Sequence, residues 1–183
     1  YLLYSPDVDT QETSSVADFI DVQRTPLAEG NYTLELMVAD KNSSDPPVRV
    51  EQAVKIHFPT DSVSFSDIEL LESYRPAKTP GPRTKSGYDL VPYALGYFPE
   101  EASRLLFYTE IYRTQPLAAE EVLVRYMISN NETHQLVQEL VGSQKRTSAP
   151  VIPLMAELPI AALPSGNYLL SVEVRNRDNR LLA

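Results

Sequence analysis

A twelve-residue pattern occurs twice in this chain and constrains its fold more than any other feature. LAEGNYTLELMV spans residues 27–38, and LPSGNYLLSVEV spans residues 163–174. In each copy a Leu-x-x-Gly-Asn turn precedes a segment of alternating side chains, which is typical of a β-strand with one face on a core. Glycine and asparagine both tolerate the positive φ of a tight turn. The repeat therefore predicts two similar units of turn and strand.

Tyr32 and Tyr168 occupy the same position in the two copies, the first inward position after the turn. In β-sandwiches of the immunoglobulin type, a tyrosine near the start of strand F bonds back to the backbone at the corner between strands E and F. We predict this structural role for both tyrosines, in preference to a role as exposed ligand-binding residues. Each copy continues with a polar turn and a second segment, so the repeat predicts the F–G hairpins of two successive sandwiches.

The fold prediction is all-β, with tandem immunoglobulin-like or fibronectin-III-like β-sandwiches of which the first is incomplete in this chain. Residues 1–60 would supply the C-terminal strands of the first sandwich, with FIDVQ (residues 19–23) as strand E. Strand F, at residues 31–39, would turn Tyr32, Leu34, Leu36 and Val38 inward, and strand G, at residues 48–58, would carry a bulge near Glu51. Residues 61–183 would form the second sandwich, with strands near 65–72, 88–98, 104–114, 121–129 and 133–141.

Composition limits the partners that this chain could bind. It has 183 residues, a net charge of −9, no cysteine and no tryptophan. The missing cysteines exclude a disulfide scaffold and a thiol nucleophile. The acidic balance disfavours nucleic acid or anionic lipid as a partner, and no run of apolar residues is long enough to span a membrane in this fragment. From its two ends we expect the chain to be a piece of a longer protein.

The residues that usually perform catalysis form no recognisable pattern here. His57 and His134 stand in no metal-binding spacing, and the motifs of serine hydrolases, P-loops and dinucleotide-binding folds are missing. The neighbouring carboxylates Glu100–Glu101 and Glu120–Glu121 would point to opposite faces of a strand, so neither pair can act on one bond. We therefore predict that the chain is not an enzyme, with no catalytic residue, no metal site and no cofactor.

One oxygen-rich loop has side chains that could bind calcium. Asp40, Asn42 and Asp45 supply oxygen ligands between the two segments of the first hairpin. The loop lacks the glycine and the bidentate glutamate of a typical calcium loop, which favours a plain Asx-turn.

The segment RPAKTPGPRTKSG, residues 75–87, concentrates positive charge in an acidic chain. It contains Arg75, Lys78, Arg83 and Lys85 and shows no periodicity. It could be a mobile solvated loop. The sharper interpretation is a docking site for an acidic partner or a glycan.

Several segments together resemble a known family. These are LAEGNYTLELMVADKN, FSDIELLES, SGYDLVPYALGYFP, LLFYTEIYRT and LPSGNYLLSVEVRNRDNRLLA. They are similar to the N-terminal region of the GWxTD-domain-containing proteins of Bacteroidetes, from about Thr25 onward. The resemblance implies tandem sandwich domains in an envelope protein, in the periplasm or associated with the outer membrane. The Gly-Trp-x-Thr-Asp motif is missing here, so no catalytic residue carries over.

A possible modification site depends on the same resemblance. Asp61-Ser62-Val63 matches the short Asp-Ser/Thr-aliphatic pattern that resembles O-glycosylation sites of Bacteroidetes. Ser62 would then carry a sugar in the linker between the two predicted domains.

These observations predict a non-enzymatic extracytoplasmic structural or interaction module that binds a protein or a glycan. One alternative is a carbohydrate-binding module that uses Tyr93, Tyr97, Tyr108 and Tyr112 as a platform, although the lack of tryptophan counts against it. Another alternative is an accessory domain of a larger enzyme.

Overall fold

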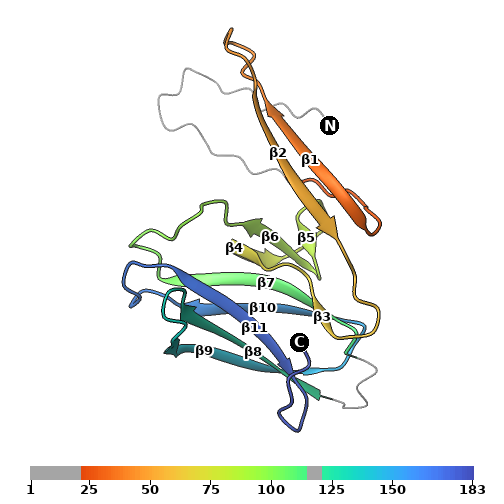
Figure 1. Cartoon of the computed structure of the whole chain (residues 1–183), viewed down its shortest axis with the longest axis vertical. Helices are drawn as coiled ribbons and strands as arrows, with labels where there is room; N and C mark the ends of the chain where they lie inside the picture. The colour runs from red at the N-terminus through yellow and green to blue at the C-terminus, as the bar shows by residue number, and fades with distance from the viewer. Residues whose placement is uncertain (1–21, 115–120) are drawn as a thin grey trace. The chain divides into compact units, whose positions relative to one another are not determined.

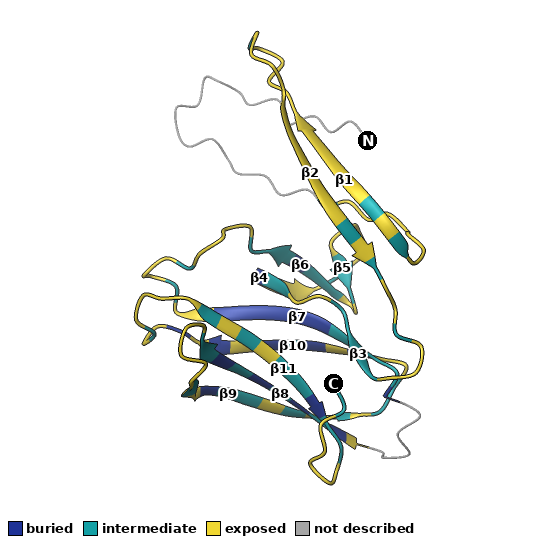
Figure 2. Cartoon of the chain, viewed as in Figure 1, coloured by how far each residue is buried: buried dark blue, intermediate teal, exposed yellow. Residues whose placement is uncertain are grey.

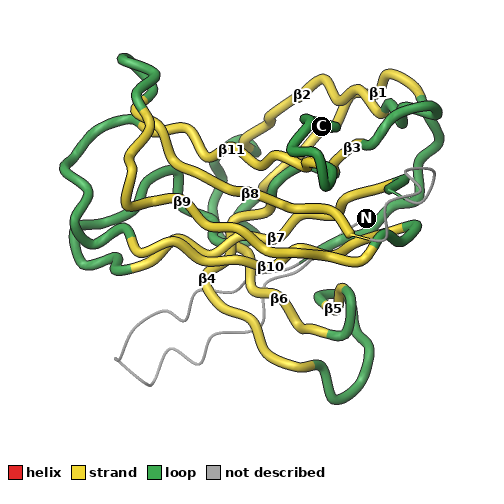
Figure 3. Tube along the Cα trace, turned by 90° about the horizontal axis from the view of Figure 1, so that it is seen from below, coloured by secondary structure: helices red, strands yellow, loops and turns green. Residues whose placement is uncertain are grey.

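The computed structural model describes residues 22–114 and 121–183, and its regular elements are all β-strands (Figure 1). The described residues include no helix, and hence none that could span a bilayer (Figure 3). The predicted all-β class is confirmed. The strands are β1 (Gly30–Val38), β2 (Val48–Ile56), β3 (Ser64–Phe65), β4 (Glu69–Pro76), β5 (Thr84–Lys85), β6 (Tyr88–Pro92), β7 (Arg104–Tyr112), β8 (Glu121–Asn130), β9 (Leu136–Thr147), β10 (Val151–Pro159) and β11 (Tyr168–Arg175).

The strands form three sheets. One contains β1 and β2, one has the order β10-β7-β4-β6-β5 with β3 also paired to β7, and one has the order β11-β8-β9. The chain divides into two compact units, of which one includes Ile68–Thr109 and Met155–Ser165, and the other includes Thr25–Asp67, Glu110–Leu154 and Gly166–Ala183. The predicted domain boundary after residue 60 stays a prediction.

The first copy of the repeat forms an antiparallel hairpin of β1 and β2. Its pairing runs from Gly30 opposite Ile56 to Val38 opposite Val48 without a shift, so the bulge predicted near Glu51 is wrong. The predicted strand E lies outside the described residues except for Val22 and Gln23, which belong to no strand.

One face of this hairpin is apolar and exposed. Because residues directly opposite each other share a face, the alternation of β1 continues across β2. Leu36 is 55% exposed and Val48 is 65% exposed, so the face expected to lie inward is uncovered (Figure 2). The side chains of this face are those of Tyr32, Leu34, Leu36, Val38, Val48, Val50, Gln52, Val54 and Ile56, of which Tyr32, Val54 and Ile56 are half-buried.

The second copy of the repeat lies on a core. Its strand β11 pairs with β8, so that Val174 lies opposite Val124 and Val172 lies opposite Tyr126. Val174 and Val124 are both fully buried. The same sequence pattern therefore forms a strand in both copies, but that strand contributes to a buried core only in the second.

The sheet formed by β4 and β6 has one face on the core and one outer face. The register shifts between Leu71 and Ser73, and this irregularity moves one residue out of the alternation. Leu71, Leu90, Leu106 and Tyr108 form a buried cluster on the core face. After the shift, the cross-strand pairs Ser73–Val91 and Arg75–Asp89 share the outer face.

The strand β10 is the longest element that the sequence pattern did not predict, and the two-residue strand β5, inside the predicted loop of residues 75–87, was missed as well. Pro153 and Pro159 obscure the alternation of β10, although Ile152, Leu154 and Leu158 are buried at every second position. Proline is tolerated in a strand at the edge of a sheet, and β10 ends the strand order of its sheet.

Candidate functional site

The basic segment predicted from the sequence lies at the ends of β4, β5 and β6. Residues Lys85 and Tyr88 pair across a two-residue turn in which Ser86 has a φ of 48° and Gly87 a φ of 84°. Positive φ at both central positions is the requirement of a type I′ hairpin turn. The dipeptide Ser86-Gly87 thus explains why the chain reverses here, and it is a signal that the sequence prediction missed.

The loop is held by side-chain hydrogen bonds. The Thr84 hydroxyl accepts from the Gly81 amide at 2.8 Å and donates to an Asp89 carboxylate oxygen at 2.6 Å. The Thr84 carbonyl accepts from the Arg24 guanidinium at 2.9 Å. These bonds give the segment a defined conformation and bring a further cation, Arg24, beside it.

The four predicted docking residues differ in how they are used. The Lys85 ammonium group forms an ion pair with Glu69 and lies 5.4 Å from the centroid of the Tyr108 ring. The Arg75 Nε lies 3.7 Å from an Asp89 oxygen, and its side chain is 76% exposed. Lys78 and Arg83 have no ion-pair partner among the described residues. Arg75, Lys78 and Arg83 are thus the cations that face solvent, and we call these three residues the basic surface.

A shallow pocket lies beside the two arginines of the basic surface. Its volume is about 190 Å³. It is lined by Ser73, Tyr74, Arg75, Arg83, Asp89 and Val91. Ser73 and Asp89 were not singled out from the sequence, because their common face depends on the register of β4 against β6.

The chemistry of this pocket suits reversible binding of an anion. A guanidinium group offers several donors in a planar fork that matches a carboxylate or a phosphate. The Asp89 carboxylate is already engaged by Thr84 and Arg75, so it only partly offsets the positive charge. An acidic group could therefore bind between Arg75 and Arg83.

The two predicted corner tyrosines have closely similar surroundings. The Tyr32 hydroxyl donates to the Ala28 carbonyl at 3.0 Å, four residues before it. A Cβ placed on Gly30 would lie 3.4 Å from Cε2 of Tyr32, and one placed on Gly166 would lie 3.4 Å from Cε2 of Tyr168. In both copies the ring folds back over the glycine of the turn, at a distance at which a Cβ would make an ordinary contact, so the ring alone does not require glycine there.

The tyrosines considered for a sugar platform lie in different environments. Tyr108 is buried, whereas Tyr97 is 66% exposed. The Tyr93 ring stacks on Phe98 at 4.6 Å, and its hydroxyl donates to the Tyr97 carbonyl at 2.9 Å. Burial, followed by the nearby Tyr97 and Glu72, raises the pKa of Tyr93 above its usual value. Tyr112 is half-buried and donates to Glu110.

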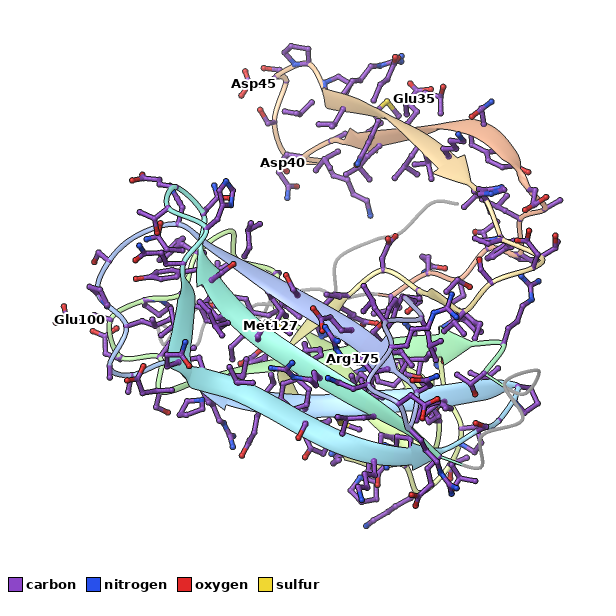
Figure 4. The ribbon with its side chains drawn as sticks, turned by 60° about the horizontal axis from the view of Figure 1, so that its bottom comes forward. Glu35, Asp40, Asp45, Glu100, Met127 and Arg175 are labelled. Carbon is purple, nitrogen blue, oxygen red and sulfur yellow. The ribbon has the colours of Figure 1, made fainter. Side chains whose placement is uncertain are left out.

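The remaining oxygen-rich and histidine positions make local contacts. Asp40 accepts from the Asn42 amide at 2.8 Å, which is an Asx-turn at the hairpin tip (Figure 4). His57 Nδ1 lies 3.4 Å from Glu29 at the surface. The described residues contain no group of three or more metal-ligating side chains.

The predicted glycosylation serine and the described members of the two carboxylate pairs lie at the surface. Ser62 is exposed between β2 and β3, where a sugar could be accommodated. Glu100 and Glu101 are exposed in a turn, Glu121 begins β8, and Glu120 lies outside the described residues.

Comparison with known proteins gives no relative: no protein-family model, no curated protein and no solved structure matches this chain. The function of the basic surface therefore has to be argued from its own geometry.

Proposed function

We propose that this chain is a non-enzymatic interaction module of a larger envelope protein, and that the basic surface binds an acidic partner. The partner would be a protein that presents carboxylate side chains, with an anionic glycan as the alternative. The module would carry this surface on a rigid set of antiparallel strands.

The observation that carries this proposal is a group of exposed positive charges on an acidic chain, of which Arg75 has a loose ion pair with Asp89 at 3.7 Å and the other two have none among the described residues. Arg75 is 76% exposed, and neither Lys78 nor Arg83 has an ion-pair partner among the described residues, although the net charge is −9. A local patch of opposite sign attracts a complementary surface and orients it during encounter. The ordered turn at Ser86-Gly87 and the bonds of Thr84 reduce the entropy lost on binding, because the loop has a defined shape beforehand.

The finer fold that we propose is a tandem of immunoglobulin-like sandwiches. Support comes from the corner contact of Tyr32 with Ala28, from the matching ring positions over Gly30 and Gly166, and from the hairpin of β1 and β2. The exposed apolar face of that hairpin has the pattern of one half of a sandwich core. The resemblance to GWxTD-domain-containing proteins supports the envelope location, in the periplasm or at the outer membrane, and O-glycosylation at Ser62.

Charge reversal tests the proposal directly. The double variant Arg75→Glu, Arg83→Glu would be compared with Arg104→Glu, which reverses an arginine that is also exposed but pairs with Glu157 on other strands. Both proteins would be immobilised and exposed to envelope extract over a range of salt concentrations. We expect the wild type and Arg104→Glu to retain the same partner and the double variant to lose it. Equal retention by all three proteins would contradict the proposal.

A further inference from the structure

The loop between β6 and β7 exposes both apolar and acidic side chains. Leu95 is 52% exposed and Tyr97 is 66% exposed. Glu100 and Glu101 follow in the same loop, are exposed, and have no ion-pair partner among the described residues. Glu100 points away from the strands (Figure 4). Residues 93–103 contain neither lysine nor arginine, and we call them the acidic loop.

Contacts within the acidic loop give it a defined conformation. The Tyr93 ring stacks on Phe98 at 4.6 Å, and its hydroxyl donates to the Tyr97 carbonyl at 2.9 Å. The Tyr93 amide donates to the Leu70 carbonyl at 2.8 Å. None of these contacts uses the side chain of Leu95 or Tyr97. The loop therefore presents these side chains to solvent on an ordered main chain, which lowers the entropy lost on binding.

The opposite charge lies at the other end of β6. This strand begins at Tyr88, beside the basic surface, and ends at Pro92, where the acidic loop starts (Figure 1). Five residues of strand span about 17 Å. No ion pair among the described residues joins the acidic loop to the basic surface within one chain. Both groups of charges are thus available for a contact between two copies.

The two ends of β6 are complementary in charge and in polarity. The pocket beside the basic surface is lined by Val91 as well as by Arg75 and Arg83. Carboxylates pair well with guanidinium groups, and the exposed side chains of Leu95 and Tyr97 can lose water against apolar atoms. Because the net charge of −9 opposes association of two copies in general, such a contact needs this local complementarity.

We propose that a second copy of this chain is the acidic partner of the basic surface. The acidic loop of one copy would dock beside Arg75 and Arg83 of the next, with Glu100 and Glu101 facing the guanidinium groups. This inference rests on the proposed function, since it names the partner of the same surface. Because the two surfaces differ, the contact is head-to-tail, and further copies can add in the same way.

Charge reversal at both ends tests the contact with the intact chain. Sedimentation equilibrium would measure association of the wild type, of Arg75→Glu, Arg83→Glu, and of Glu100→Lys, Glu101→Lys. We expect the average mass of the wild type to rise with concentration, and each double variant alone to associate at least about tenfold more weakly. An equimolar mixture of the two variants should associate again, because an unchanged acidic loop then meets an unchanged basic surface.

Two control variants change the net charge by the same amounts at other exposed positions. Glu132→Lys, Glu139→Lys alters the turn after β8 and the strand β9, and Arg104→Glu, Arg180→Glu alters two arginines outside the basic surface. Both controls should associate like the wild type. Equal weakening by the controls would mean that association follows the net charge, and would overturn the inference.

An acidic peptide separates this inference from the function proposed above. Capped tetraglutamate would be added to the wild type, and the main-chain NMR signals of Arg75 and Arg83 would be followed. If the peptide shifts these signals but the chain stays monomeric up to about 1 mM, the partner is not a second copy and the proposed function stands. If the chain neither binds the peptide nor associates, both are wrong. Association that persists in both double variants, or that their mixture fails to restore, would also overturn the inference.

Discussion

The ring of Tyr126 lies directly over Gly142, its cross-strand neighbour in the pair of β8 and β9. A Cβ on Gly142 would lie 2.1 Å from Cε2 of Tyr126, which is closer than any real contact. Tyr126 is only 8% exposed, so its ring has little room to move away. The glycine is thus required by the tyrosine that packs over it, and it does not mark a turn.

The substitution Gly142→Ala should therefore destabilise the fold. Overpacking of a buried site typically costs about 1–3 kcal/mol in the free energy of unfolding. The control is Gly96→Ala, because a Cβ on Gly96 would meet no atom within 4 Å. Urea unfolding followed by circular dichroism would measure both. Equal stability of the two variants would show that Tyr126 does not cover Gly142.

A second prediction concerns Thr114, a polar side chain that is fully buried. Its hydroxyl donates to the Ala149 carbonyl at 2.9 Å and accepts from the Ala149 amide at 3.0 Å. Thr114→Val would leave both main-chain groups without a partner and should lower the free energy of unfolding by about 1–3 kcal/mol. Thr114→Ser retains the hydroxyl and should be the less damaging change. If Thr114→Ser were the more damaging, the methyl group would matter more than the hydrogen bonds.

The repeat provides a matched pair of positions with opposite burial. Val38 is 59% exposed and Val174 is fully buried, although they hold the same place in the two copies. Val38→Asp should change the free energy of unfolding by no more than about 0.5 kcal/mol, as is usual for a surface position. Val174→Asp should cost more than about 3 kcal/mol or prevent folding, because it buries an unpaired charge. A large loss of stability with Val38→Asp would mean that the hairpin face is covered in solution.

The corner contact of Tyr32 gives a local prediction. Tyr32→Phe removes the donor to the Ala28 carbonyl and should weaken the start of β1 by about 0.5–1.5 kcal/mol. Amide exchange within β1 would report this change, because the hairpin can open without unfolding the other sheets. Tyr97→Phe is the control, since Tyr97 is 66% exposed. If amide exchange in β1 were unchanged in Tyr32→Phe, the hydrogen bond from Tyr32 to the Ala28 carbonyl would not stabilise the strand.

Sequence pattern predicted most strands because alternation and turn residues are local properties. The segments expected around Leu36, Phe107, Val124 and Val174 all form strands. Burial could not be predicted in the same way, since Leu36 and Val172 follow one pattern but differ in what lies over them. Whether an alternating strand is covered depends on distant segments of the chain.

The same distinction holds for the candidate site: some of its residues can be recognised from the sequence alone, and others only from the pairing of distant strands. The cations Arg75 and Arg83 could be recognised from the sequence because their charge is unusual in this chain. Asp89 and Ser73 could not, because the irregularity between Leu71 and Ser73 decides which residues share their face. Likewise, the sequence could not show that Lys85 forms an ion pair within the chain, because its partner Glu69 lies sixteen positions away.

Crosslinking in intact envelopes tests the proposed binding role most directly. An amine-reactive crosslinker would be applied to cells that express the parent protein, and mass spectrometry would locate the crosslinked lysines. Lys78 belongs to the basic surface, whereas Lys55 and Lys145 lie on β2 and β9. The account predicts recurrent crosslinks from Lys78 to one acidic partner, and their loss in the variant Arg75→Glu, Arg83→Glu. Crosslinks to partners from Lys55 or Lys145 but none from Lys78 would contradict it.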